Sequence, residues 1–204
     1  MGKIFYLMGK SASGKDHIYE HLLKQADLEL KPLILYTTRP IRSGEENGRE
    51  YFFVTEERLA RLRREGKIIE ERMYQTVHGP WYYFTADDGQ ICPEKYDYLG
   101  IGTLDSYQKM KAHFGEKILV PLYVETEDGI RLARALKRER KQEQPKYAEM
   151  CRRFLADCED FAEEKIRKAG ILKRFSNNGV IEDCFSEIQN FVEQEKKLCY
   201  NERK

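Results

Sequence analysis

The chain opens with Lys3–Gln25, KIFYLMGKSASGKDHIYEHLLKQ, in which three kinds of segment follow one another. Lys3–Met8 is a short apolar run whose length and flanks predict a buried strand. Gly9–Gly14 is small and polar, which is typical of a loop, and the apolar residues of Lys15–Gln25 recur at a helical spacing. A strand, a glycine-bounded loop and a helix in this order indicate a parallel α/β fold.

The loop itself matches the phosphate-binding pattern GxxxxGK. Its glycines let backbone N–H groups converge on phosphate oxygens, and the positive end of the following helix points to the same place. An ordinary strand-to-helix turn is the alternative, which the flanking strand and helix disfavour. We expect Lys15 to reach the outer phosphates as a catalytic residue. The expected ATP-binding residues are Gly9, Lys10, Ser11, Ala12, Ser13, Gly14, Lys15 and Asp16.

Asp16 departs from the full pattern, which has Ser or Thr after the lysine to bind Mg²⁺. A carboxylate also binds Mg²⁺, but without the metal it would repel a triphosphate. Asp16 therefore either holds the metal or marks a damaged site. We expect Mg²⁺ to be the cofactor and Asp16 to be its protein ligand.

A second candidate anion site lies in Thr37–Val54, TTRPIRSGEENGREYFFV. Two arginines three positions apart, a glycine-rich loop and a tyrosine could together grip one phosphate, because arginine forks and a phenol hydroxyl are suitable donors. Arg39, Arg42 and Tyr51 are the candidates. A solvated charged loop would be the default interpretation of an isolated arginine pair.

The pattern TTRxxRxGExxGxxYxFV in this segment resembles the monophosphate-binding segment of guanylate kinases at almost every position. The resemblance runs through the whole chain and weakens after residue 75. It implies that the glycine loop binds ATP and that Arg39, Arg42 and Tyr51 hold the phosphate of GMP, with Arg39 also catalytic. It further implies that Glu70, in Ile68-Ile69-Glu70, reads the guanine edge. His78 takes the position of a substrate-binding tyrosine in the family.

Some positions depart from the family pattern. A serine of the family is Leu35 here, and a YGTS-like turn appears as HGPW from His78. Both aspartates of an LDIDxQG segment are glycine, at Gly100 and Gly102. In the family one of these aspartates organises Mg²⁺ and the other reads guanine, so the resemblance implies GMP as acceptor with relaxed base specificity. The metal's anionic partner would have moved from position 100 to Asp16.

The basic segment Arg131–Lys141 resembles the family's lid. Arg134 and Arg138 lie one helical turn apart, and lid arginines stabilise charge on the transferring phosphoryl group, so both are expected to be catalytic. Arg152 and Arg153 lie on the next expected helix, where the family has another phosphate-contacting arginine. A solvated basic helix is the alternative. Asn177 matches an asparagine that lies near the ATP base in the family.

We expect one α/β domain with a P-loop NTPase parallel-sheet core and helices on both faces. Its core would comprise residues 1–36, 91–127 and 168–204, with a small mixed monophosphate-binding insert over 37–90 and a helical lid over 128–167. The core strands expected after the first are Leu33–Tyr36, Tyr98–Ile101, Leu122–Val124 and Ile171–Phe175. Because proline removes a ladder donor, the third either excludes Pro121 or includes it at a place where that donor is not needed.

Charge and cysteine content limit the kinds of partner that the protein can be expected to bind. Lys and Arg number 36 and Asp and Glu 35, so the net charge of +1 provides no global field for nucleic acid or a membrane surface. The five cysteines include no CxxC pair, which favours reduced thiols in a cytoplasmic protein over disulfides or a zinc site. We expect no membrane span, because no apolar run approaches about 20 residues, and no signal peptide, because the expected first strand begins at Lys3. We expect small-molecule nucleotides as partners, and a monomer or homodimer.

Two functions stay open on these grounds. The first is an ATP-dependent nucleoside monophosphate kinase that converts GMP to GDP. The alternative is a non-catalytic guanylate kinase-like module that binds a nucleotide or a phosphorylated peptide. Such scaffold domains resemble this chain in keeping the phosphate arginines, but they lose the glycine loop. Lys15 and both loop glycines favour the enzyme, whereas Asp16 and the missing aspartates favour the module or an altered substrate.

Overall fold

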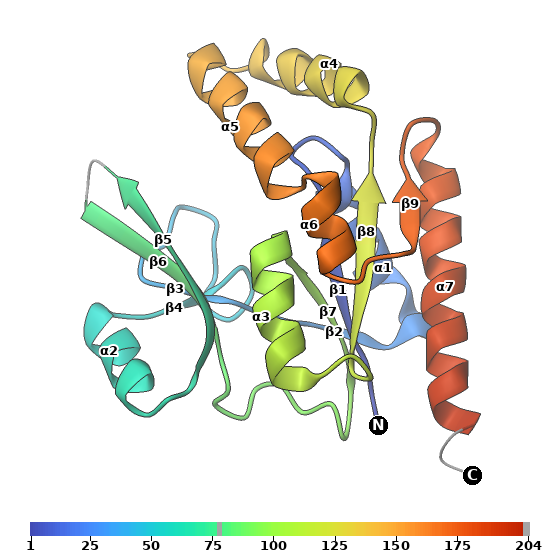
Figure 1. The fold of residues 1–204 in the computed structure, drawn as a ribbon. Coiled ribbons are helices and arrows are strands. Elements are labelled where there is room, and N and C mark those ends of the chain that lie inside the picture. Colours follow the sequence, from blue (N-terminus) through green and yellow to red (C-terminus); the bar gives the residue numbers. More distant parts are fainter. Residues whose placement is uncertain (77–78, 202–204) are drawn as a thin grey trace.

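The structure, a computed structural model, describes residues 1–76 and 79–201 and contains two sheets (Figure 1). The larger sheet has five parallel strands in the order β2-β7-β1-β8-β9. Their bounds are Ile4–Met8 (β1), Leu30–Pro32 (β2), Asp97–Gly102 (β7), Leu119–Glu125 (β8) and Arg174–Ser176 (β9). The expected parallel core, entered through the strand–loop–helix unit at the N-terminus, is confirmed.

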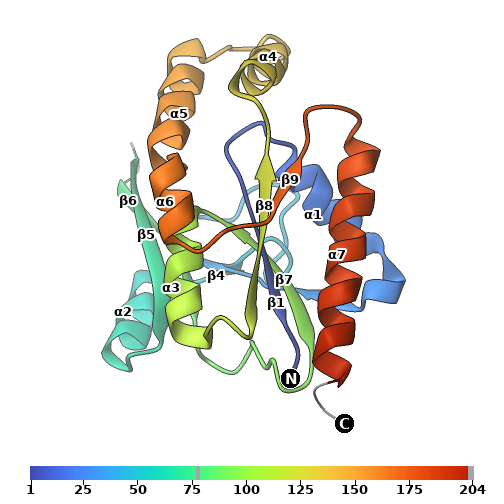
Figure 2. The same cartoon turned by 45° about the vertical axis from the view of Figure 1, so that its right-hand side comes forward.

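Helices cover both faces of this sheet (Figure 2). The helices α1 (Lys15–Lys24) and α7 (Ile181–Asn201) pack on one face, where the alternate β1 residues Phe5 and Leu7 point. The helices α3 (Leu104–Phe114) and α6 (Glu163–Lys168) pack on the other. Because β1 is buried on both faces, its sequence is apolar at every position rather than alternating.

The smaller sheet is mixed and has the order β4-β3-β6-β5. Its strands are Tyr36–Thr37 (β3), Phe52–Phe53 (β4), Ile68–Thr76 (β5) and Gly79–Ala86 (β6). The helix α2 (Glu56–Arg64) packs on it through a separate apolar cluster. Its N-cap is Thr55, whose side chain accepts from the Arg58 N–H. A 3₁₀ turn covers Ala26–Leu28.

The remaining helices, α4 (Asp128–Glu139) and α5 (Tyr147–Asp160), lie beyond the carboxyl end of β8, above the glycine loop in Figure 1. Open parallel sheets place their ligand sites at this end. Across 1–76 and 79–201, no helix combines the length and apolar character that a bilayer crossing requires.

The expected strand Leu33–Tyr36 is wrong. The edge strand of the large sheet is β2, and the chain leaves that sheet after the Leu33 N–H donates to Leu99 O at 2.8 Å. Tyr36 already belongs to the smaller sheet. Leu33 and Leu35 are apolar because they pack into the core from the connection between the two sheets, and the sequence pattern does not distinguish such packing from strand pairing.

Of the two expectations for Pro121, exclusion from its strand is wrong, and a position where its missing donor is not needed is confirmed. The Ile4 N–H donates to Ile118 O, and the Asn177 N–H donates to Glu125 O. The backbone N–H and C=O groups of odd-numbered β8 residues therefore point toward β9 rather than toward β1. Because β9 pairs with β8 only from Tyr123 onward, Pro121 lies where no strand needs its missing donor.

The last strand is shorter and later than the expected Ile171–Phe175. Ile171 is buried under α6 in the core cluster, while Leu172 is 89 % exposed, so this apolar pair belongs to a connection. The strand begins at Arg174 and its Phe175 packs on the opposite face.

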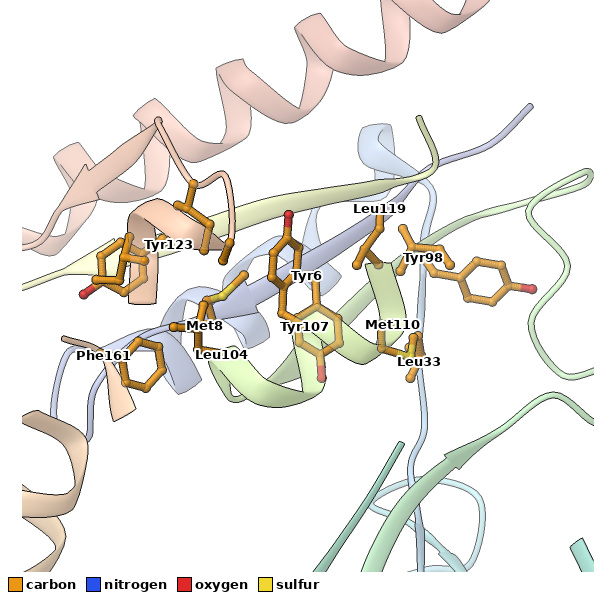
Figure 3. Close-up of a cluster of buried hydrophobic side chains, with 14 of the residues drawn as sticks. Tyr6, Met8, Leu33, Tyr98, Leu104, Tyr107, Met110, Leu119, Tyr123 and Phe161 are labelled. Carbon is orange, nitrogen blue, oxygen red and sulfur yellow. The ribbon is translucent and has the colours of Figure 1, made fainter. Parts of the chain in front are cut away.

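Tyr6 explains the two glycines of β7. Its ring lies between β1 and α3 among the buried side chains of Figure 3, and its hydroxyl donates to Ser106 Oγ at 2.8 Å. A Cβ at Gly100 would lie 2.9 Å from the Tyr6 ring. A Cβ at Gly102 would lie 2.7 Å from Ser106 Oγ and would clash with the Tyr6 hydroxyl. Tyr6 therefore occupies the space that side chains at positions 100 and 102 would need.

We expect Gly102→Ala to destabilise the protein, because the new methyl group overpacks against Tyr6 and Ser106. Overpacking of this kind costs about 1–3 kcal/mol, measurable by urea unfolding. Tyr6→Phe removes one clashing atom and should recover part of the loss in the double variant. Gly179→Ala is the control, since no atom lies within 4 Å of its Cβ position. Equal stability of Gly102→Ala and wild type would contradict the clash.

Candidate functional site

The glycine loop between β1 and α1 holds two left-handed residues, Ala12 at φ 62° and Gly14 at φ 91°. Gly14 precedes α1 and supplies no side-chain cap, so the first N–H groups of the helix are left for another acceptor. A Cβ on Gly14 would clash with Asn177 Nδ2, which requires glycine here. The loop therefore offers backbone donors at the positive end of a helix, which suits an anion.

Two buried side chains support the loop from below. Asn177 Nδ2 donates to Ser13 O at 2.7 Å, and Thr126 Oγ1 donates to the same oxygen at 3.3 Å. Asn177 follows β9 and Thr126 follows β8, so the carboxyl ends of two neighbouring strands fix the loop. The structure thus places the Asn177 side chain against the loop backbone, and its contact with an ATP base stays a prediction.

Lys15 is half-buried at the start of α1. Burial lowers the pKa of its ammonium group, while the neighbouring Asp16 carboxylate opposes the shift. Within 1–76 and 79–201, no hydrogen bond or ion pair engages its ammonium group. Its three donors are therefore available for phosphate oxygens.

Ser11 joins the loop to α4 and α5 through all three of its polar groups. Its N–H donates to Asp157 Oδ2 at 2.7 Å, its carbonyl accepts from Arg131 Nη1 at 3.0 Å, and Arg153 Nη2 lies 3.4 Å from its hydroxyl. Arg131 is only 1 % exposed and also pairs with Asp128 at 2.7 Å.

Asp128 in turn accepts from Lys10 of the loop at 3.1 Å. Sequence reasoning missed Asp128, Arg131 and Asp157, because charges on amphipathic helices are usually solvated and nothing in the spacing marks these three as buried partners of the loop.

The arginines of α4 and α5 differ in their position relative to the glycine loop. Arg138 lines a cavity of about 200 Å³ together with Ser11 and Arg153. Arg138 and Arg153 lie close enough to Lys15 to act on its charge. Arg134 is half-buried on α4 and has no hydrogen bond or ion pair to any described residue. Arg138 and Arg153 therefore share a cavity with the loop residue Ser11, whereas Arg134 lines neither this cavity nor the larger one described next.

A larger cavity of about 1040 Å³ lies between the two sheets and α5. It receives Asp16 from α1, carboxylates of other elements, and the aromatic side chains Tyr51, Tyr74 and Tyr83. Five arginines line it, namely Arg42, Arg49, Arg72, Arg152 and Arg153. A cavity of this size and charge suits a phosphorylated ligand with a planar group.

Two of the three predicted monophosphate residues, Arg42 and Tyr51, line this cavity. Arg39 does not, because it is 4 % exposed and both ends of its guanidinium bind Glu45, at 2.7 and 2.5 Å. The hydrogen bond from Arg39 lowers the pKa of Glu45 to about 2. The Arg39 guanidinium lies 5.1 Å from the ring centroid of Tyr51, so it supports a cavity-lining side chain without lining the cavity itself.

Glu70 is also buried, at 1 % exposed, and does not line the cavity. Thr85 Oγ1 donates to its Oε1 at 2.9 Å, and Arg72 Nε lies 3.2 Å from its Oε2. Burial raises the pKa of the Glu70 carboxyl, and the Arg72 guanidinium opposes this shift. His78, the other expected base-end residue, lies outside the described residues.

Comparison with known proteins gives concordant findings. Residues 1–96 match the guanylate kinase family model. The chain is 37 % identical over 81 residues to a guanylate kinase of Thermotoga maritima, covering 40 % of this chain and 37 % of that relative. It is 29 % identical over 121 residues to one of Porphyromonas gingivalis, covering 58 % of this chain and 63 % of the relative. The matched part of the chain thus spans 37–63 % of the length of these two relatives.

A solved structure extends the likeness beyond the N-terminal half. The crystal structure of guanylate kinase from Anaplasma phagocytophilum superposes with a TM-score of 0.61, covering 95 % of this chain and 86 % of that one. At 20 % sequence identity, this likeness shows the fold.

Proposed function

We propose, because these matches support membership of the guanylate kinase family, that the chain transfers the γ-phosphoryl group of ATP to a nucleoside monophosphate. GMP is the proposed acceptor, with relaxed base specificity. One observation carries the proposal: Asp16 and Arg153, which flank the glycine loop, line the same cavity as Arg42 and Tyr51. A donor on the loop and an acceptor phosphate on Arg42 would therefore meet in one cavity.

The chemistry assigned to the chain is positioning and charge neutralisation, without a covalent intermediate. The loop N–H groups and Lys15 would bind the triphosphate, and Arg42 and Tyr51 would orient the acceptor phosphate. Arg138 and Arg153 would offset charge that develops on the transferring group. The helices α4 and α5, which contact the loop through Ser11, would limit access of water to the phosphates.

Mg²⁺ fits the donor chemistry at Asp16. Asp16 is exposed on the first turn of α1 and lines the cavity, and Glu20 lines it one helical turn later. No group of three or more His, Cys, Asp or Glu side chains within 1–76 and 79–201 forms a ready-made metal site, so phosphate oxygens and water would complete the shell. When bound, the metal would neutralise phosphate charge, and Asp16 would hold it.

Asp16→Asn should weaken the binding of Mg²⁺-ATP and strengthen the binding of metal-free ATP. The amide keeps the shape but removes a charge that repels phosphates unless a cation lies between them. ATP titrations by calorimetry with and without Mg²⁺ measure both effects. Asp27→Asn, an exposed carboxylate beyond the end of α1, is the matched control. If wild type and Asp16→Asn respond to Mg²⁺ identically, Asp16 is not a ligand.

The proposed activity is tested by incubating the protein with ATP, Mg²⁺ and each common nucleoside monophosphate in turn. We expect GDP from GMP at a rate above the background hydrolysis of ATP. Binding of nucleotides without any transfer would reject the kinase and support the non-catalytic module.

A further inference from the structure

The strand β5 forms one wall of the large cavity, and this wall carries a positively charged side chain that the sequence analysis did not predict, Arg72. Side chains of a strand alternate between its faces, so Glu70, Arg72 and Tyr74 share one face. Across the ladder Glu70 lies opposite Thr85, and Arg72 lies opposite Tyr83. Arg72, Tyr74 and Tyr83 line the cavity, whereas Glu70 does not. The first charged group that a ligand meets on this wall is therefore a guanidinium.

The carboxylate behind it lies deeper in the sheet. One Glu70 oxygen accepts from Thr85, and the other lies 3.2 Å from Arg72 Nε in an ion pair without a hydrogen bond. Because Glu70 is 1 % exposed and does not line the cavity, a ligand meets Arg72 before it can reach the unpaired Glu70 oxygen.

The neighbouring strand of the large sheet offers no replacement carboxylate. Positions 100 and 102 are glycine, and the Tyr6 ring and hydroxyl fill the space above them. Positions 100 and 102 of β7 therefore supply no carboxylate to bind N–H groups of a base.

Arg72 keeps donors for a ligand. Its side chain is 19 % exposed, and its guanidinium has no hydrogen bond to any residue the structure describes. A guanidinium presents N–H groups in a fixed fork and no acceptor, so it pairs with two adjacent lone-pair atoms.

We propose that Arg72, rather than Glu70, reads the acceptor's base, and that it selects purines in which O6 and N7 both accept hydrogen bonds. This inference rests on the proposed function and refines its relaxed specificity. Guanine and hypoxanthine both present O6 and N7 to an arginine fork. Adenine presents N7 beside an amino donor at N6, which opposes the fork. The tyrosine rings of the same wall, Tyr74 and Tyr83, provide aromatic surface for a planar base.

Two modified acceptors separate this mechanism from reading by Glu70. A carboxylate would bind the N1–H and 2-amino groups of guanine, so it would lose a contact with IMP and none with 7-deaza-GMP. Arg72 would lose nothing with IMP and one contact with 7-deaza-GMP. We expect kcat/KM for IMP within about threefold of GMP, about tenfold lower for 7-deaza-GMP, and about 10- to 100-fold lower for AMP.

Substitutions test whether the base preference depends on the Arg72 side chain. Arg72→Met keeps the length but removes the donors, and should reduce the GMP-to-AMP preference at least about tenfold. Glu70→Gln should keep the preference, since an amide oxygen still accepts from Thr85. Arg63→Met is the matched control, because Arg63 pairs with Glu71 of the same strand and lies outside the cavity lining. Glu70→Gln combined with Arg72→Met avoids an unpaired buried carboxylate if Arg72→Met alone fails to fold.

Dissociation constants for the four acceptors, measured by calorimetry, keep the test separate from catalysis. If no monophosphate is phosphorylated, the proposed function fails, yet the order of affinities still decides the role of Arg72. Strong binding of 7-deaza-GMP with weak binding of IMP would overturn the inference. Loss of base preference in Glu70→Gln, or full preference in Arg72→Met, would overturn it as well.

Discussion

Lys15→Met will reduce phosphoryl transfer by about 10²- to 10³-fold or more, with the fold intact. Lys15 has no hydrogen bond or ion pair among the residues described, so its removal leaves no protein group unpaired. Its charge lies at the mouth of a loop whose other donors are backbone N–H groups. Loss of one preorganised donor to the charge that develops in the transition state costs about 2.7–4 kcal/mol. Steady-state kcat with ATP and GMP measures the loss.

Lys24→Met is the matched control for this experiment. Lys24 is an exposed lysine at the other end of the same helix, and its replacement should leave kcat unchanged. Thermal unfolding of both variants separates lost chemistry from lost structure. Full activity in Lys15→Met would reject the loop as the site of the triphosphate.

Arg42→Met should weaken substrate binding and Arg39→Met should lower stability, although both arginines belong to one motif. Arg42 is exposed and lines the cavity, so its loss should raise KM for the monophosphate by about 10- to 100-fold, or 1.5–3 kcal/mol, and leave KM for ATP nearly unchanged. Arg39 is buried against Glu45, so its loss should lower the melting temperature of the protein before it affects either substrate.

Two measurements distinguish these outcomes. KM values for both substrates report on Arg42, and thermal unfolding reports on Arg39. Arg49→Met supplies a comparison from the same loop, since Arg49 lines the cavity but also pairs with Glu46 and Glu50. Equal effects of Arg42→Met on the two substrates would contradict separate donor and acceptor sites. An Arg39→Met variant of normal stability with a raised KM for GMP would place Arg39 on the phosphate after all.

The fold class followed from the sequence because its deciding features are local. The run Lys3–Met8, the loop glycines and the helical spacing after Lys15 each reflect a single stretch of chain. The errors in strand position arose where apolar residues are buried by parts of the chain that are distant in sequence. Leu33, Leu35 and Ile171 are apolar because distant helices and connections cover them, not because they pair in a sheet.

The same division applies to the candidate site. Lys15, Arg42 and Tyr51 were identifiable from a motif; Arg42 and Tyr51 line the large cavity, and Lys15 is half-buried at the start of α1. Arg39 and Glu70 fit their motifs equally well, yet their side chains are held by Glu45 and by Thr85 with Arg72. A motif predicts which position in the chain carries a functional side chain. Whether that side chain can reach a ligand depends on ion pairs and hydrogen bonds with other residues, which need not be near it in sequence.

Tyr6 also constrains how this chain can change over generations. A carboxylate at position 102 cannot be introduced by one substitution without a clash, because the Tyr6 hydroxyl occupies that space. Shrinking Tyr6 first would leave a void beside Ser106 and Tyr107, which lowers stability before any benefit arises. Either order passes through a weakened intermediate, so positions 6, 100 and 102 should vary as a set among descendants of this sequence. Lineages that carry the tyrosine are thereby held to a β7 strand without a carboxylate at positions 100 and 102.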